Sequence, residues 1–251
     1  MSGIFACSVN VGYNTATVNA HSYFALALQF DDVTNPGVSN RVDTLLAPTG
    51  LTGATAFGAS MDQIWRYDSG ENMWVKYGYY KTSRTATPAW KRYDAANNAF
   101  LELTDDDVVT AGDTILFYRG GAQTTLTLSG AVKAFVATPS YALSAHAYTF
   151  IAYPWPVAFP IADISNYYAG VGATSFGSSM DQVWRYDASE NMWVKYGFYK
   201  TSRTATPAWK RYDSVNNTFL DLGESDVIPA GQGFLFYRGG AATTLTFTYG
   251  N

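Results

Sequence analysis

The chain has 251 residues, of which 47% are hydrophobic, 16% aromatic and 14% charged. This apolar content supplies a sizeable core and excludes an intrinsically disordered chain. The formal net charge of −4 argues against a nucleic-acid partner, because nucleic-acid affinity comes from Lys and Arg that neutralise phosphates. The longest apolar run, residues 150–162, contains three prolines and is shorter than the roughly 20 residues of a transmembrane helix, so we expect no transmembrane segment.

The N-terminal segment MSGIFACSVN lacks the basic region and the long apolar stretch of a signal peptide, and we expect none in the sequence as given. Cys7 is the single cysteine, which excludes an internal disulfide and a cysteine-based zinc site. We interpret Cys7 as a small strand residue, with an intermolecular disulfide as the alternative.

Strand patterns follow one another along the chain, beginning with a predicted strand over residues 4–11. Residues 73–80 alternate with a period of two, as a half-buried strand does, and one face is formed by Met73, Val75, Tyr77 and Tyr79. Residues 125–128 and 244–247 alternate in the same way. No stretch of helical periodicity exceeds about two turns. The sequence therefore predicts an all-β protein.

Two kinds of turn are predicted between these strands. Gly120-Gly121 follows residues 117–119 and is expected to supply the positive φ angles of a tight hairpin. In the motif of Tyr93-Asp94, Asn98 and Phe100, we expect the Asp and Asn side chains to close a short loop while the rings pair across the strands. The same motif returns at Tyr212-Asp213.

An internal repeat is the main feature of the sequence. Residues 54–130 match residues 173–249 without a gap, with 55 identities in 77 aligned positions and a constant offset of 119. Upstream the match is weaker, with His21 aligned to His146 at an offset of 125. A period near 120 residues indicates a duplicated domain and not a short solenoid repeat. We predict two tandem homologous β-sandwich domains, jelly-roll or immunoglobulin-like, over residues 1–130 and 131–251.

Several short motifs recur in fixed order. They are an opening Val11-Gly12-Tyr13, a central Asp-Gln-Ile-Trp at residues 62–65 (Asp-Gln-Val-Trp at 181–184), a Pro-Ala-Gly-Gln-Gly-Phe turn at 229–234 and a closing Thr-Leu-Thr-Leu-Ser-Gly at 125–130. The first copy departs from the turn motif, with Thr-Ala-Gly-Asp at 110–113. With these motifs the chain resembles a family of secreted bacterial β-rich proteins of uncharacterised biochemical role. The resemblance implies export to the extracellular space or the cell surface and a β-sandwich-like fold, and it supplies no catalytic residues.

Aromatic side chains are the main candidates for ligand or partner contacts. Exposed Trp and Tyr rings can stack on sugar rings, which predicts a carbohydrate-binding module, or they can be hot spots of a protein interface. The core needs some of these rings as well, so both uses compete with burial. The candidates are the equivalent pairs Trp74 with Trp193 and Trp90 with Trp209.

Signals for catalysis or metal binding are weaker. No nucleophile motif surrounds a serine, and Asp62 with Glu71 or Asp181 with Glu190 are more simply interpreted as strand and loop residues than as the carboxylate pair of a glycosidase. We expect no enzyme activity and no required cofactor. Calcium is kept as an alternative to a solvated turn because hard cations bind clustered carboxylates. Its candidate ligands are Asp105, Asp107, Glu224 and Asp226.

The two ends of the chain suggest self-association. Residues 124–130 continue into residues 131–135, interpreted as the first strand of the second unit, whereas the equivalent strand at residues 243–249 and the N-terminal strand have no such neighbour. Head-to-tail strand addition between copies would complete both ends and build an open filament. The apolar segment 150–162 is a second candidate contact, either between the two units or between subunits, with packing on its own core as the alternative. The predicted interface residues are Ile4, Phe5, Cys7, Val9, Val11, Trp155, Val157, Phe159, Phe247 and Tyr249.

These patterns predict a non-enzymatic bacterial structural protein that self-assembles with copies of itself into an extracellular filament, tube or surface layer. The alternative is a tandem carbohydrate-binding module with cell-surface polysaccharide as its partner. A glycoside hydrolase is the third and weakest hypothesis.

Overall fold

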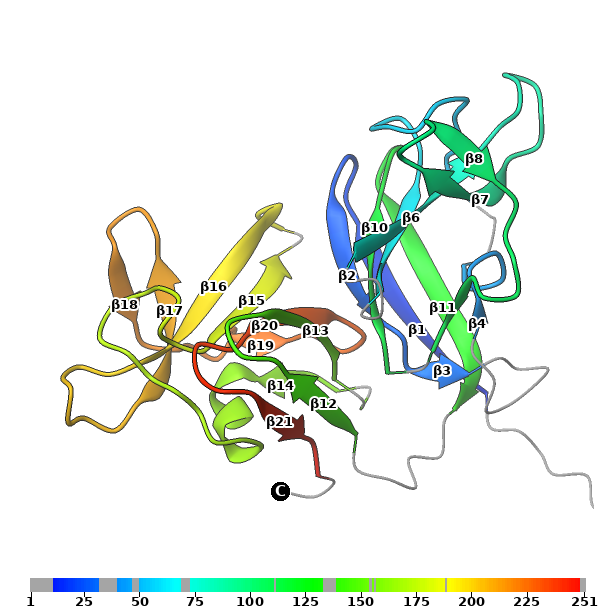
Figure 1. Cartoon of the computed structure of the whole chain (residues 1–251). Coiled ribbons are helices and arrows are strands. Elements are labelled where there is room, and N and C mark those ends of the chain that lie inside the picture. The colour runs from blue at the N-terminus through cyan, green and yellow to red at the C-terminus, as the bar shows by residue number, and fades with distance from the viewer. Residues whose placement is uncertain are drawn as a thin grey trace, which may run out of the picture.

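The computed structural model describes residues 11–31, 40–46, 50–68, 73–110, 112–132, 139–153, 155, 157–187 and 189–248. These residues are all-β, as predicted, with antiparallel sheets and a 3₁₀ helix, η1 (Ile161–Asn166). No helix among them is long and apolar enough to cross a membrane. Figure 1 shows two lobes, the first built by strands β1 to β11 and the second by strands β12 to β21.

The first lobe contains a six-stranded sheet with the order β2-β10-β5-β6-β7-β8, a three-stranded sheet β1-β11-β3 and the pair β4-β9. The strands are β1 (Val11–Val18), β2 (Tyr23–Ala27), β3 (Phe30–Asp31), β4 (Asn40–Arg41), β5 (Gln63–Asp68), β6 (Met73–Tyr80), β7 (Ala89–Asp94), β8 (Ala99–Leu101), β9 (Val108–Val109), β10 (Thr114–Tyr118) and β11 (Thr124–Val132).

The second lobe has a six-stranded sheet with the order β13-β20-β15-β16-β17-β18, together with the pairs β12-β21 and β14-β19. This order matches that of the first lobe strand for strand, as the internal repeat requires. The strands are β12 (Ser140–Leu143), β13 (Tyr148–Ala152), β14 (Phe159–Pro160), β15 (Gln182–Asp187), β16 (Met192–Tyr199), β17 (Ala208–Asp213), β18 (Thr218–Leu220), β19 (Val227–Ile228), β20 (Gly233–Tyr237) and β21 (Thr243–Thr246).

Each lobe has its own hydrophobic core on the inner face of its large sheet. The alternation predicted for residues 73–80 is confirmed, because β6 buries Val75, Tyr77 and Tyr79 and directs the intervening side chains to the outer face. Leu126 and Leu128 of β11 join the same core, so the three-stranded sheet packs on the six-stranded one. In the second lobe Leu245 and Phe247 close the equivalent core.

A buried ion pair fixes the start of β5 in the first lobe. Asp62, which is fully buried, accepts hydrogen bonds from Arg119 Nη1 at 2.5 Å, Thr52 N at 2.7 Å and Gly120 N at 2.8 Å. The second lobe repeats this arrangement with Asp181 and Arg238, whose Nη1 lies 2.7 Å from the carboxylate. Charge-assisted bonds of this kind lock the connection after β10 or β20 onto the sheet.

The tight hairpin predicted at Gly120-Gly121 is wrong. β10 pairs with β2 and β5, whereas β11 pairs with β1 and β3, so the glycines lie in a crossover between two sheets. Neither has a positive φ. Glycine is needed there for space, since a Cβ at Gly120 would lie 2.4 Å from the backbone of Met61.

The loop motif of Tyr93, Asp94 and Asn98 is confirmed. The Tyr93 hydroxyl donates to Asn98 Oδ1 at 2.9 Å, and Asp94 Oδ1 accepts the backbone N–H groups of Ala96 and Asn97. Asn98 has a left-handed φ of 49°. Tyr212, Asp213 and Asn217 reproduce these bonds in the second lobe.

The prediction of an incomplete C-terminal strand is wrong for the described residues, whereas the predicted N-terminal strand over residues 4–11 lies outside them except for Val11. β1 pairs with β11 along its whole length, and β21 pairs with β12, so each lobe completes these strands from its own sequence. β11 also runs on to Val132 and pairs there with β3, which carries it past the predicted boundary at residue 130. Residues 131 and 132 therefore end a strand of the first lobe, whereas residues 133–135 lie outside the described residues.

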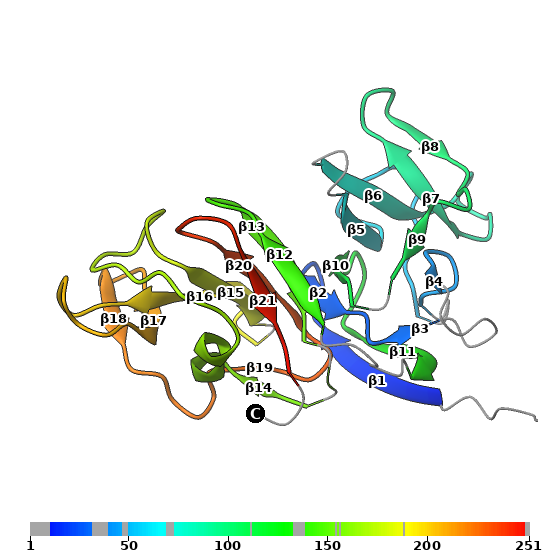
Figure 2. The same ribbon diagram turned by 60° about the horizontal axis from the view of Figure 1, so that its bottom comes forward.

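The lobes contact each other through β2 and β10 on one side and β13 and β20 on the other, as Figures 1 and 2 show from two directions. Ala27 N donates to Gly231 O at 2.9 Å across the junction. Gln29 Nε2 donates to the carbonyl oxygens of Trp155 at 3.1 Å and Tyr153 at 3.3 Å. Part of the segment 150–162 is therefore a contact between the lobes, one of its two predicted alternatives.

Equivalent positions of the two repeats meet at this junction. Thr114 opens β10 and Gly233 opens β20, and a Cβ at Gly233 would lie 2.3 Å from Thr114 Cγ2. The outer faces of the two large sheets thus approach each other at the corresponding strands β10 and β20. The absence of a side chain at Gly233 allows this approach.

Candidate functional site

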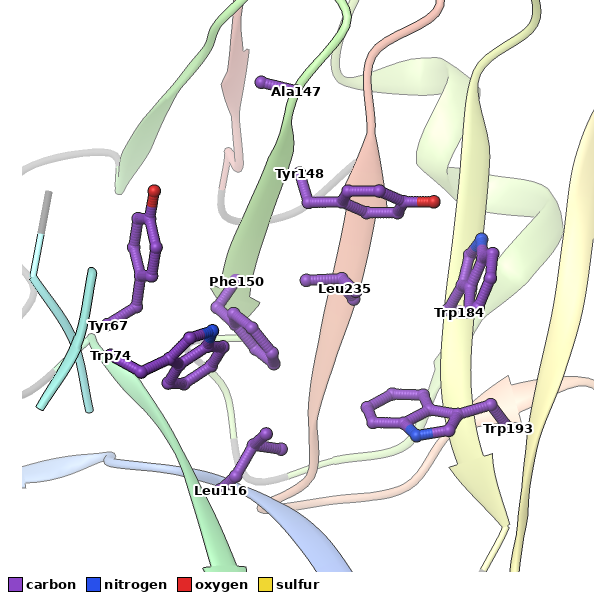
Figure 3. A pocket seen from close by; sticks show the side chains of 9 residues that line it. All are labelled: Tyr67, Trp74, Leu116, Ala147, Tyr148, Phe150, Trp184, Trp193 and Leu235. Carbon is purple, nitrogen blue, oxygen red and sulfur yellow. The ribbon is translucent and has the colours of Figure 1, made fainter. Parts of the chain in front are cut away.

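A cavity of about 460 Å³ lies between the two lobes and is the candidate site. This volume falls in the range of small-molecule sites, about 300–1,000 Å³. Six of the nine lining residues are aromatic and none is charged. We call it the aromatic cleft, and its lining is Tyr67, Trp74, Leu116, Ala147, Tyr148, Phe150, Trp184, Trp193 and Leu235 (Figure 3).

Strand alternation directs these side chains into the cleft. The inner face of β16 supplies Val194 and Tyr196 to the core, so Trp193 must lie on the outer face. In the neighbouring strands, Phe150 is directly opposite Leu235 and Leu235 is directly opposite Trp184. Directly opposed residues of antiparallel strands share a face, so these side chains form one continuous row.

Trp74 and Trp193 are equivalent residues that enter the cleft from opposite sides, with Phe150 and Leu235 between them (Figure 3). Trp74 packs against the rings of Trp65 at 6.3 Å, Tyr67 at 5.5 Å and Phe150 at 5.1 Å. Among the described residues, Trp193 packs against one ring, that of Tyr186 at 5.5 Å. Both indoles are half-buried, and Trp193 has fewer aromatic neighbours than Trp74.

Trp184 is fixed at the edge of the cleft by three neighbours. The Lys195 ammonium lies 4.4 Å from the ring centroid, Tyr148 packs edge-on at 5.7 Å, and Nε1 donates to Gln182 Oε1 at 3.0 Å. The cation–π contact and the hydrogen bond hold the indole in one orientation. The Tyr148 hydroxyl is protonated at neutral pH, as an ordinary tyrosine is, and partial burial raises its pKa further, so it can donate a hydrogen bond.

Two further hollows adjoin the aromatic cleft. The outer hollow, about 620 Å³, shares Trp184 and Trp193 with the cleft and adds polar side chains that include Glu190, Arg211 and Asp213. The inner hollow, about 580 Å³, shares Tyr67, Ala147, Tyr148 and Phe150 with the cleft and adds Arg66, Asp68, Asp113, Tyr141, Ser144 and Thr149. The aromatic centre is thus flanked on two sides by hydrogen-bonding groups.

The predicted ligand aromatics divide into two classes. Trp74 and Trp193 line the cleft, whereas Trp90 and Trp209 are each 4% exposed and belong to the two cores. Phe150, Trp184 and Tyr148 were not among the predicted ligand aromatics. Period-two alternation places each of them on an outer face, but which outer faces meet depends on how the lobes pack.

The predicted subunit-interface residues lie in different environments. Phe159 and Phe247 are buried in the core of the second lobe, which leaves no ring surface for a neighbouring copy, and Trp155 packs on Tyr153 and Phe247. Val157 is exposed. Val11 lies in β1 opposite Ala131. Ile4, Phe5, Cys7, Val9 and Tyr249 lie outside the described residues.

The candidate calcium ligands do not converge. Asp107 is buried and accepts hydrogen bonds from Tyr77 OH at 3.0 Å and Thr104 N at 2.7 Å, and Asp226 accepts the equivalent bond from Tyr196 OH at 2.9 Å. Asp105 pairs instead with Arg41, and Glu224 is exposed. Within the described part of the chain, no group of three or more His, Cys, Asp or Glu side chains is placed to hold a metal ion.

The candidate glycosidase acids are not placed for catalysis either. Asp62 and Asp181 are fully buried in ion pairs, and Glu71 lies outside the described residues. Burial raises the pKa of Asp62, although two backbone N–H groups and Arg119 act in the opposite direction. Glu190 lines the outer hollow, but Asp181, the other acid of its predicted pair, does not.

Comparison of the chain with protein families, with curated proteins and with solved structures found no match. The resemblance to secreted bacterial β-rich proteins accordingly stays a prediction.

Proposed function

We propose that this protein is a non-enzymatic, extracellular carbohydrate-binding protein that holds a neutral sugar chain in the aromatic cleft. It would consist of two homologous β-sandwich domains that arose by duplication, and the cleft would be formed only where the two are joined. The matching strand orders of the two large sheets and the two separate cores support this architecture.

The observation that carries the proposal is the neutral lining of the cleft, with Trp74 and Trp193 on opposite sides. A sugar ring has apolar C–H faces and a rim of hydroxyl groups, so it matches indole faces flanked by hydrogen-bonding groups. Ligand sites of this kind combine an apolar, aromatic lining with a few polar groups that fix orientation. The nine lining residues contain no carboxylate, imidazole or thiol, which favours binding over hydrolysis.

Binding to insoluble polysaccharides and titration with soluble oligosaccharides test this proposal. Trp193→Ala should remove about 2 kcal/mol of binding free energy, which is about a 30-fold loss of affinity. The substitution deletes the indole on which the ligand would stack, and aromatic contacts of this kind dominate binding energies. Tyr13→Ala is the matched control, since Tyr13 is 78% exposed on β1 and does not line the cleft. Failure of the unmodified protein to bind any neutral glycan would contradict the proposal.

Self-association is the second proposed function, favoured by the free side of β1. β11 pairs with one side of this eight-residue strand, and no strand of the described chain pairs with the other. Unprotected edge strands are templates for pairing with another copy. Light scattering and negative-stain microscopy should then show polymers that disappear when Tyr13→Lys charges the edge. A monomer at all concentrations would contradict it.

A further inference from the structure

The polar side-chain atoms of the aromatic cleft are mostly hydrogen-bond donors. Its lining includes the indoles of Trp74, Trp184 and Trp193, and an indole N–H can donate a hydrogen bond but cannot accept one. The other polar side-chain atoms of the lining are the hydroxyl oxygens of Tyr67 and Tyr148, and no lining side chain carries a carboxylate or an amide. The lining side chains therefore offer a ligand more donors than acceptors.

Two of the indole donors are not used by the protein itself. Trp184 Nε1 is occupied, because it donates to Gln182 Oε1 at 3.0 Å. Among the described residues, Nε1 of Trp74 and Nε1 of Trp193 have no hydrogen-bond partner, and neither nitrogen is buried. An accessible donor of this kind bonds water, so a ligand that displaces the water must replace its hydrogen bond.

The floor of the cleft is apolar. It consists of Leu116, Phe150 and Leu235, which are all half-buried and which we call the apolar floor (Figure 3). A ligand hydroxyl that lay on these side chains would lose its hydrogen bonds to water and find no replacement. A methyl group in the same place would instead gain from leaving water. The cleft thus suits a ligand that combines a small apolar group with a hydrogen-bond acceptor.

An acetyl group has this combination. Its carbonyl oxygen accepts hydrogen bonds and donates none, and its methyl group is apolar. A sugar hydroxyl, by contrast, brings a hydrogen that needs an acceptor, and the lining side chains offer acceptors only at two tyrosines. Sugars carry acetyl groups without a change of charge, either as an acetamido group or as an acetyl ester.

We propose that the aromatic cleft selects an acetylated neutral sugar, whose methyl group packs on the apolar floor and whose carbonyl oxygen accepts a hydrogen bond from Trp193 Nε1. This inference rests on the proposed carbohydrate-binding function and adds the substituent that the site recognises. Trp193 is assigned because it has fewer aromatic neighbours than Trp74, against which Phe150 packs edge-on at 5.1 Å. Trp193 is thus a specificity-determining residue.

The test is calorimetric titration of the full chain with two pairs of disaccharides. N,N′-diacetylchitobiose and cellobiose differ only in whether the second carbon of each ring carries an acetamido group or a hydroxyl, and O-acetylated xylobiose differs from xylobiose only in its acetyl esters. In at least one pair the acetylated sugar should bind about tenfold or more tightly than its partner, since a hydrogen bond contributes about fivefold and a buried methyl group about fourfold. The pair with the larger ratio identifies the acetamido group or the ester as the recognised form.

Trp193→Phe keeps an aromatic ring in the cleft and removes the N–H. It should reduce the preference for the acetylated sugar to about fourfold or less, which is the contribution of the methyl group alone. Trp209→Phe is the matched control, because it also removes an indole N–H from the second lobe, but Trp209 is buried in the core and does not line the cleft. Its preference should stay within about twofold of that of the unmodified protein.

Three results would overturn the acetyl inference and leave the proposed function in place. They are equal affinities within both pairs, binding of chitobiose, the free-amine sugar, as tightly as its acetylated form, and retention of an unacetylated glycan without binding of either acetylated disaccharide. A preference that is lost in Trp74→Phe but kept in Trp193→Phe would overturn the assignment to Trp193. Absence of binding to any neutral glycan, acetylated or not, would overturn the inference and the proposed function together.

Discussion

The two lobes share 55 of 77 aligned residues in their matching parts, yet their outer faces have different environments at the junction. Tyr67 is 38% exposed, whereas its equivalent Tyr186 is 5% exposed. Tyr186 is covered because Ser22 and Tyr23 of the first lobe lie close to its hydroxyl, which donates to Asn191 Oδ1. Identical local sequence therefore fixes the strand and its face, and the neighbouring lobe decides whether the side chain is buried or accessible.

One row of side chains explains why the two tryptophans of the cleft differ. In the second lobe the row is Phe150, Leu235, Trp184 and Lys195, and in the first lobe the equivalent row is Ala25, Leu116, Trp65 and Lys76. Phe150 covers Trp74 at 5.1 Å. Its counterpart Ala25 has no ring with which to cover Trp193. The cleft thus depends on a position at which the two lobes differ, Phe150 in the second and Ala25 in the first.

The largest expected effect concerns the buried ion pair that both lobes contain. Asp62→Ala and Asp181→Ala each leave a buried arginine without its partner, which should lower the free energy of unfolding by about 3–5 kcal/mol. Urea denaturation of each variant measures this loss. Because each carboxylate accepts hydrogen bonds from one arginine and two backbone N–H groups, losses that differed by more than about 1 kcal/mol would break the equivalence of the lobes.

The next effect tests the junction. Gly233→Ala should destabilise the protein by about 1–3 kcal/mol, since the new methyl group would lie 2.3 Å from Thr114 Cγ2. Combination with Thr114→Gly should restore most of the loss. Gly177→Ala is the control, because nothing lies within 4 Å of a Cβ there. A neutral Gly233→Ala would show that the outer faces do not meet at these positions.

A third prediction separates the two tryptophans by stability. Trp74→Ala should cost about 1–3 kcal/mol more than Trp193→Ala, because Trp74 packs on two more rings and each aromatic pair contributes about 0.5–1.5 kcal/mol. Thermal and urea unfolding without ligand provide the measurement. Equal losses would argue that Trp193 is as tightly packed as Trp74.

The smallest effect concerns alkaline pH. Burial raises the pKa of Tyr77 and Tyr196, so the folded protein keeps both hydroxyls protonated above pH 10, where unfolded tyrosines ionise. Stability should be complete below about pH 10 and fall as the pH rises further, by up to about 1.4 kcal/mol per pH unit for each residue. Tyr77→Phe and Tyr196→Phe should flatten this dependence equally in unfolding measured from pH 8 to 11. An unchanged slope in either variant would contradict the assignment of this pH dependence to the substituted tyrosine.

The sequence was sufficient to predict the all-β class and the alternation of residues 73–80, because both depend on a local period of two. It misled at Gly120-Gly121, where glycine serves a close approach to Met61 and not a hairpin. The pairing of β1 with β11 was missed because it joins strands more than 100 residues apart. Of the nine residues that line the cleft, only Trp74 and Trp193 were predicted, since its other rings become neighbours when two separate lobes pack.

The most direct test of the aromatic cleft is an NMR titration of the seven indole N–H resonances with a neutral hexasaccharide that the protein retains. The resonances of Trp74, Trp184 and Trp193 should shift with ligand concentration, while those of the buried Trp90 and Trp209 should stay in place. Shifts confined to other tryptophans, or equal shifts at Trp90 and Trp209, would contradict a site between the lobes.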